Sequence, residues 1–194
     1  MKKIITIFFF LITPLQTNEL NEFQIYGLSI GDNLSEKFSK AQILDAEKNK
    51  WHHHKKKNED FYTILFLNDK INYNLEPYSG IKFKLKSKDI NYIIYGIEGQ
   101  ILFDDIKSCL SEKESVEKDI LKITNNKNLV RTNDKFSGFG ETISYITEFI
   151  FEKGIIQTRC VDWDKKNKNV KKAWMPDLEI SIVSNEYIKW YNSE

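Results

Sequence analysis

The residues best suited to metal chemistry are three consecutive histidines, His52, His53 and His54, which are all the histidines of this 194-residue chain. Adjacent side chains point about 100° apart on a helix and about 180° apart on a strand, so at most two of them, such as His52 and His54, can face one ion. No cysteine lies nearby, and three lysines follow directly. We therefore predict no metal site, and retain His52–His54 as the ligand set of an alternative, a small metal-binding protein or hydrolase.

Two carboxylates, Asp162 and Asp164, flank Trp163 at the expected end of a strand. Such a pair can work as acid and base or bind an ion, but no histidine or nucleophile lies close in sequence. A second pair, Asp104 and Asp105, precedes a predicted helix, where the helix dipole favours negative charge. The sequence thus predicts no catalytic residue and no cofactor, with Asp162 and Asp164 as the residues of the hydrolase alternative.

Two lysine-rich stretches, residues 48–57 and 165–172, lie near Trp51 and Trp174. If the fold brings them together, they form a cationic patch that suits lipid headgroups or acidic polysaccharide. The net charge of +1 lacks the clear basic excess of a nucleic-acid-binding protein. The expected partner is a protein or an anionic envelope component, and not nucleic acid.

The N-terminus has the pattern of a secretory signal. Lys2 and Lys3 precede an apolar run over residues 4–12, and Pro14 follows it. The run is too short to span a bilayer, and cleavage near Thr17 would leave a chain without a transmembrane span. We predict a signal peptide over residues 1–17, a single domain over residues 18–194, and a periplasmic or secreted location.

The chain has two cysteines, Cys109 and Cys160. In an exported protein they most simply form one disulfide, whose loop of about 50 residues stabilises the fold by about 4 kcal/mol. The first cysteine lies far from the N-terminus, which excludes a lipidated start of the bacterial lipoprotein kind.

The hydrophobic pattern predicts strands and two main helices. Residues 81–86 alternate strictly, with Ile81, Phe83 and Leu85 on one side and three lysines on the other, which is typical of an antiparallel sheet with one solvated face. Further strands are expected over residues 23–26, 61–67, 92–97, 100–103, 143–151, 155–163 and 178–182. Helices are expected over residues 34–46, 106–124 and 186–191, and a loop over residues 125–140.

This order predicts a two-layer α+β fold. We expect an antiparallel sheet of about six to seven strands, with two main helices packed on one face and a short C-terminal helix. The series of one helix and three strands occurs twice, which indicates two related structural halves.

Three segments, Gly27–Leu34, Tyr95–Gly99 and Cys160–Trp163, together resemble a family of small exported proteins of unassigned function from AT-rich marine alphaproteobacteria. The resemblance extends over most of residues 23–190 and implies a periplasmic single domain. The matching motifs are a helix entry, a strand turn and the cysteine pair, so the resemblance implies no functional residue.

The expected function is that of an exported binding or envelope-associated module without catalysis. The alternative is an enzyme using His52–His54 or Asp162 with Asp164. A concave pocket in which those groups converge would favour the enzyme, whereas a flat exposed sheet would favour the binding module.

Overall fold

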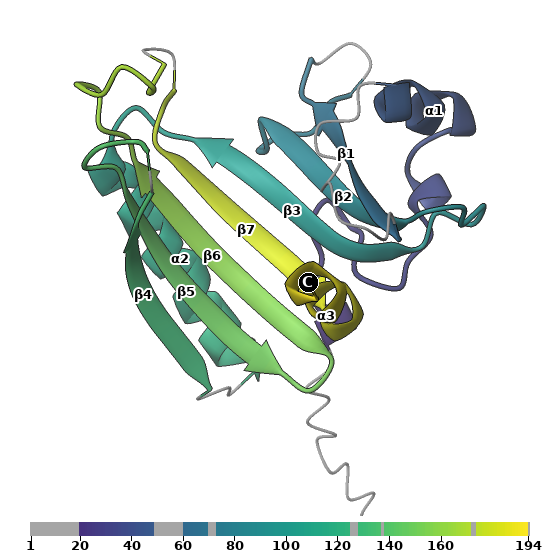
Figure 1. The fold of residues 1–194 in the computed structure, drawn as a ribbon. Helices are drawn as coiled ribbons and strands as arrows, with labels where there is room; N and C mark the ends of the chain where they lie inside the picture. The colour runs from purple at the N-terminus through teal and green to yellow at the C-terminus, as the bar shows by residue number, and fades with distance from the viewer. Residues whose placement is uncertain are drawn as a thin grey trace, which may run out of the picture.

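A single antiparallel sheet dominates the structure, a computed structural model that describes residues 20–48, 60–69, 73–124, 128–136, 138–171 and 174–193. Its seven strands lie in the order β1-β2-β3-β7-β6-β5-β4 (Figure 1). The strands are β1 (Phe61–Leu67), β2 (Gly80–Lys86), β3 (Ile94–Leu102), β4 (Leu129–Lys135), β5 (Ile143–Phe151), β6 (Gly154–Asp162) and β7 (Asp177–Ser184). The predicted α+β class is confirmed.

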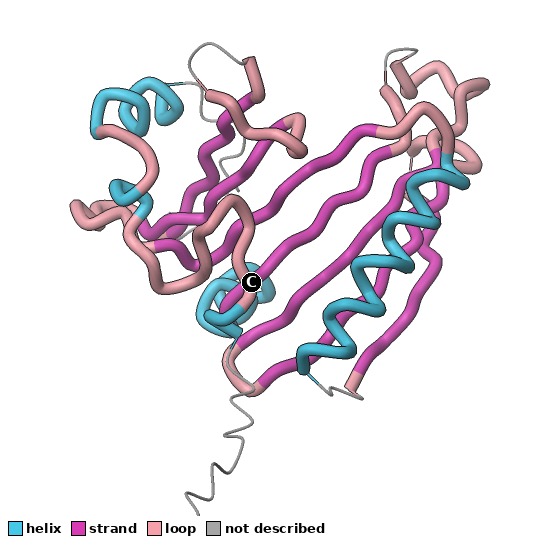
Figure 2. The backbone as a smooth tube through the Cα atoms, turned by 180° about the vertical axis from the view of Figure 1, so that it is seen from behind, coloured by secondary structure: helices cyan, strands magenta, loops and turns pink. Residues whose placement is uncertain are grey.

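The helices lie on both faces of the sheet. Helix α1 (Lys40–Lys48) and helix α2 (Ile106–Thr124) lie on one face, and α2 runs along β6 and β7 (Figure 2). The short helix α3 (Asn185–Asn192) lies on the opposite face, in front of the sheet in Figure 1. Two short 3₁₀ helices, η1 (Leu20–Glu22) and η2 (Leu34–Glu36), precede α1. No helix of the described residues is long and apolar enough to cross a membrane.

The main core lies between the sheet and the two longer helices. Apolar side chains from six neighbouring strands pair in register to form one continuous row across the sheet, and each is at most 2% exposed: Ile64, Phe83, Ile97, Ile182, Ile156 and Phe149. Ile43 from α1 and Ile120 from α2 join the same cluster. Burial of this row explains why one side of each strand is apolar.

Helix α2 is joined to β6 by the predicted disulfide between Cys109 and Cys160. Farther along the helix, Lys113 interrupts the apolar stripe. Its ammonium contacts Glu117, one turn away, and donates a hydrogen bond to Thr147 at 2.7 Å. Arg131 of β4 also contacts the Glu117 carboxylate, at 3.0 Å. Opposite charges paired in this way allow the buried lysine and glutamate to lie between helix and sheet.

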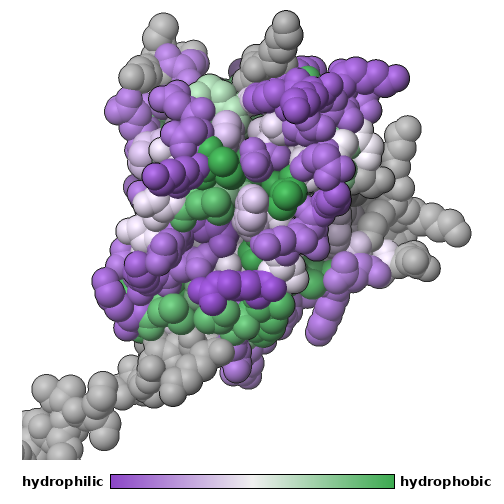
Figure 3. Space-filling view, turned by 90° about the vertical axis from the view of Figure 1, so that its left-hand side faces the viewer, coloured by the Kyte–Doolittle hydropathy of each residue, from purple (hydrophilic) through white to green (hydrophobic). Residues whose placement is uncertain are grey.

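Several predictions of local structure were wrong. The strands expected over residues 92–97 and 100–103 form one strand, β3, and residues 23–26 contribute only an isolated bridge between Ile25 and Leu28. Helix α2 is followed by four strands, so the series of one helix and three strands does not occur twice. The helix expected over residues 34–46 is divided into η2 and α1, because Ser39 and Gln42 form a capping box that starts a new helix: Gln42 accepts a hydrogen bond from Ser39 N at 2.9 Å. The loop expected over residues 125–140 contains strand β4, which lies at the sheet edge and exposes most of its side chains, so no apolar alternation marks it. The side of the molecule with this edge is mostly hydrophilic, with separate apolar patches (Figure 3).

Candidate ligand-binding cleft

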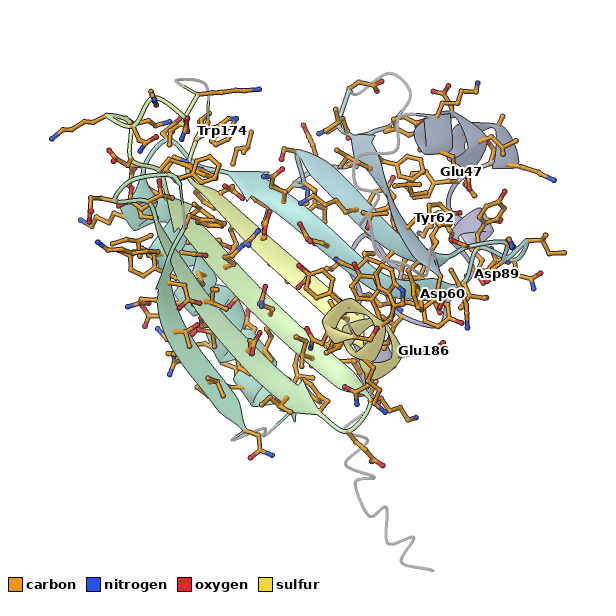
Figure 4. The ribbon with its side chains drawn as sticks, viewed as in Figure 1. Glu47, Asp60, Tyr62, Asp89, Trp174 and Glu186 are labelled. Atoms are coloured by element: carbon orange, nitrogen blue, oxygen red, sulfur yellow. A yellow bond between two sulfur atoms is a disulfide. The ribbon has the colours of Figure 1, made fainter. Side chains whose placement is uncertain are left out.

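The face of the sheet opposite α1 and α2, which we call the open face, is covered only in part. Helix α3 covers one end, where Tyr187 and Trp190 pack against Phe61 of β1. The loop between β6 and β7 lies at the other end, where Trp174 is labelled in Figure 4. Between them, side chains of β2, β3, β7 and β6 line a cleft.

The floor of the cleft is a network of ion pairs. Lys82 contacts the carboxylates of both Glu98 and Glu179, Lys84 contacts Glu98 at 3.3 Å, and Arg159 contacts Glu179. The sequence predicted that the lysines of β2 would face water. This holds for Lys86, whose side chain is 44% exposed, but the side chains of Lys82 and Lys84 are only 19% and 13% exposed. Glutamates from two neighbouring strands pair with these two lysines and allow their burial.

The charges of the floor depend on one another. Burial alone would raise the pKa of Glu98, but the adjacent ammonium groups of Lys84 and Lys82 outweigh that effect and lower its pKa to about 2. Glu98 is therefore ionised over the physiological pH range, and the floor is a fixed arrangement of charges.

At the end of the cleft away from α3, aromatic rings form a compact cluster. The Trp163 and Trp174 ring centroids lie 4.6 Å apart, and Phe136 stacks on Trp163 at 5.9 Å. The guanidinium carbon of Arg159 lies 5.9 Å from the centre of the Phe136 ring. The indole N–H of Trp163 donates to the carbonyl oxygen of Met175 at 3.1 Å, which fixes the ring.

This cluster is one wall of a cavity of about 390 Å³, which we call the aromatic pocket. Aliphatic side chains, including Leu65, Leu102 and Val161, complete the walls. The polar groups lie at the floor, where Gln100 donates to the carboxylate of Asp177 at 3.0 Å. Apolar walls with a few placed polar groups are typical of small-molecule sites.

A second cavity of about 470 Å³ lies beside α3. Its lining includes Lys84, Glu98, Gln157 and Tyr187. Burial raises the pKa of Tyr187 to about 12, so its hydroxyl keeps its proton at neutral pH. Arg159 and Glu179 line both cavities, so the two spaces adjoin on the open face, and we call them together the cleft.

Most of the residues singled out in the sequence lie elsewhere. His52–His54 and Trp51 lie outside the described residues. Neither Asp162 nor Asp164 lines either cavity. The Asp164 carboxylate accepts hydrogen bonds from the backbone N–H groups of Glu141 and Lys166, at 3.1 and 3.0 Å, which also lower its pKa. Asp164 thus serves as a turn residue.

Glu47 and Asp60, the described acidic residues nearest in sequence to the three histidines, have separate surroundings (Figure 4). Glu47 accepts a 2.6 Å hydrogen bond from the Tyr62 hydroxyl. Burial, reinforced by this bond, raises the pKa of Tyr62. Within the described ranges, no group of three or more His, Cys, Asp or Glu side chains is placed to hold a metal ion.

The sequence interpretation missed Gln100, Asp177 and Glu179 as cleft residues. A signal existed, since Asp177 and Glu179 alternate with Leu178 and Ile180 and so lie on the face of β7 opposite the main helices. Trp174 was interpreted as the companion of a surface lysine patch, and the structure places it in the aromatic pocket.

Comparisons with known proteins add no further constraint. No protein-family model, curated protein or solved structure matches the chain.

Proposed function

We propose that this protein is a non-catalytic binding module whose ligand lies in the cleft on the open face. One observation carries the proposal: the middle of the sheet is left uncovered, and the uncovered part has apolar walls and an ordered charged floor. Cavities of about 300–1,000 Å³ suit small molecules, and both spaces fall in that range.

The construction of the floor supports binding. Its ion pairs come from rigid strands, and the indole of Trp163 is held by a backbone hydrogen bond. Side chains that are already ordered lose little conformational entropy when a ligand arrives, so more of the contact energy appears as affinity.

We further propose that the module is exported and works in the periplasm or outside the cell, in association with the envelope. The cationic, apolar N-terminal sequence supports this location. The disulfide between Cys109 and Cys160 also supports it, because such bonds persist mainly in oxidising compartments.

A hydrolase is the second hypothesis, and one observation favours it. Two carboxylates of the open face have pKa values displaced in opposite directions, since burial raises the pKa of Asp177 whereas the neighbouring lysines lower that of Glu98 despite its burial. Such divergence is found in acid–base pairs. However, Glu98 contacts two lysines, which hold its carboxylate in ion pairs. The case for Asp162 and Asp164 as the acid–base pair is also weak, because the Asp164 carboxylate accepts hydrogen bonds from backbone N–H groups.

The binding proposal is tested by mapping where small organic probes gather on the protein. Phenol and isopropanol are titrated into the ¹⁵N-labelled protein, and chemical shifts are followed for the backbone, the Gln100 amide and the Trp163 and Trp174 indoles. We expect the largest shifts at the cleft, reduced in Trp174→Ala and unchanged in Ile90→Ala, a side chain that is 86% exposed and lines neither cavity. Shifts scattered over the surface, or centred on the α2 face, would contradict the proposal.

A further inference from the structure

The floor of the aromatic pocket contains a carboxylate in an unusual position. Asp177 is 4% exposed and lines the pocket at the start of β7. Its hydrogen-bonding neighbours are uncharged: the amide of Gln100, which donates at 3.0 Å, and the indole of Trp163. Burial raises the pKa of Asp177, although Gln100, Arg159 and other neighbours act in the opposite direction. The folded protein therefore holds this carboxylate where its charge is incompletely compensated.

Comparison with the other buried acids makes the difference clear. Three carboxylate residues are buried in the described part of the chain: Glu117, Asp177 and Glu179. The first and the last each contact two cations, namely Lys113 and Arg131 for Glu117, and Lys82 and Arg159 for Glu179. Among the described residues, no lysine or arginine forms an ion pair with Asp177.

The nearby cations are already engaged. Lys82 contacts Glu98 and Glu179, and Arg159 contacts Glu179. Lys84 also contacts Glu98, outside the lining of the aromatic pocket, so the floor has three cations against these two glutamates. Asp177 makes the count of charges even, but it forms no ion pair with any of the three cations. A free anion entering the pocket would meet paired cations together with the carboxylate of Asp177, an unfavourable arrangement.

The walls suit a cation with an apolar body. Trp163, Trp174 and Phe136 present aromatic rings, whose faces carry partial negative charge and attract ammonium groups. Met175 adds a polarisable thioether, and Leu102 adds an aliphatic surface. The aromatic rings thus serve two purposes: their faces attract the ammonium group, and they pack against the apolar part of the ligand.

We propose that the aromatic pocket binds an organic ammonium ion, a primary or alkylated amine on an apolar body, with the ammonium group against Asp177 and the body against Trp163 and Trp174. This inference rests on the proposed function of the cleft. The ligand supplies the cation that every other buried carboxylate of the described chain receives from a lysine or arginine, and it removes the cost of burying an uncompensated charge.

Three probes of nearly the same shape test the inference: phenethylamine, phenethyl alcohol and phenylacetate, which are cationic, neutral and anionic at neutral pH. Dissociation constants are measured by chemical-shift titration, with the Trp163 and Trp174 indole signals reporting the site. We expect the amine to bind at least about tenfold more tightly than the alcohol, and phenylacetate to bind most weakly.

Variants separate charge recognition from shape. Asp177→Asn keeps the volume and should reduce the affinity for the amine by about tenfold, with the alcohol unchanged within about twofold. Asp134→Asn, on β4 and outside both cavities, is the matched control and should behave like the wild type. If Asp177→Asn does not fold, the preference of the wild-type protein for amine over alcohol still decides the question.

The possible failures are distinct. Equal affinity for the amine and the alcohol at the indole signals, or an unchanged affinity for the amine in Asp177→Asn, overturns the ammonium inference and leaves the cleft as a binding site. An absence of shifts at Trp163 and Trp174 with all three probes also overturns the inference. The proposed function itself fails only if phenol and isopropanol also avoid the cleft.

Discussion

The floor of the cleft provides a quantitative test through Glu98→Gln. The change keeps the size of the side chain but removes the charge that Lys82 and Lys84 share. These lysines lower the pKa of Glu98 from 4.5 to about 2, against the effect of burial. At about 1.4 kcal/mol for each pH unit, the ionised carboxylate stabilises the folded protein by about 3 kcal/mol at neutral pH. That value agrees with the cost of about 3–5 kcal/mol for breaking a buried ion pair.

The sign of the pH dependence follows from the direction of the shift. Because the pKa is lower in the folded than in the unfolded protein, the stabilisation is complete above about pH 4.5 and is lost as the pH falls toward about 2. The free energy of unfolding is measured by urea titration, with the disulfide intact, at neutral pH and near pH 2. We expect Glu98→Gln to be less stable than the wild type by about 3 kcal/mol at neutral pH, and the difference to shrink in acid.

A matched control is available on the same face. Glu186 contacts Lys86 at 3.0 Å, but the two side chains are 54% and 44% exposed. Solvent screens such pairs, so Glu186→Gln should change the stability by less than about 1 kcal/mol. The reasoning is refuted if Glu98→Gln costs no more than this control, or if its cost is the same at neutral and acid pH.

Two further predictions concern the α2 layer and the compartment. Lys113→Met should destabilise the protein by about 3 kcal/mol in urea titrations, because Glu117 then loses its nearest buried cation. Combination with Glu117→Gln should cost less than the sum of the two changes, and additive costs would contradict the pairing. Expressed with its leader in a Gram-negative host, the protein should appear in the periplasmic fraction, shorter by about 17 residues and about 2 Da lighter before reduction than after it. A full-length, reduced cytosolic product would contradict export.

The sequence predicted those elements whose signal is local. The alternation of Ile81, Phe83 and Leu85 correctly identified a strand with one buried side. The two cysteines were correctly paired because a chain with only two cysteines has one intramolecular pairing. Strand β4 was missed because an edge strand exposes its side chains and is held by backbone hydrogen bonds, which leave no apolar period in the sequence.

The cleft could not be predicted because it depends on which strands become neighbours. Lys82 and Glu179 are 97 residues apart in the sequence and meet only because β7 lies next to β3 in the sheet. The lysines of β2 were therefore assigned to water. Likewise, the position of Trp174 beside Trp163 depends on the loop between β6 and β7, whose lysine-rich sequence indicates only exposure.

The position of β7 also determines the order in which the protein can be completed. Strands β1–β3 and β4–β6 form two separate antiparallel sets, and β7 is the strand that pairs with both β3 and β6. Until β7 is available, β3 and β6 each lack one of their two neighbouring strands, and the charged floor of the cleft lacks Glu179. If the protein is exported unfolded and N-terminus first, in line with the location proposed above, this strand would emerge after the other six. On that proposal, the central strand of the sheet would delay folding until translocation is nearly finished.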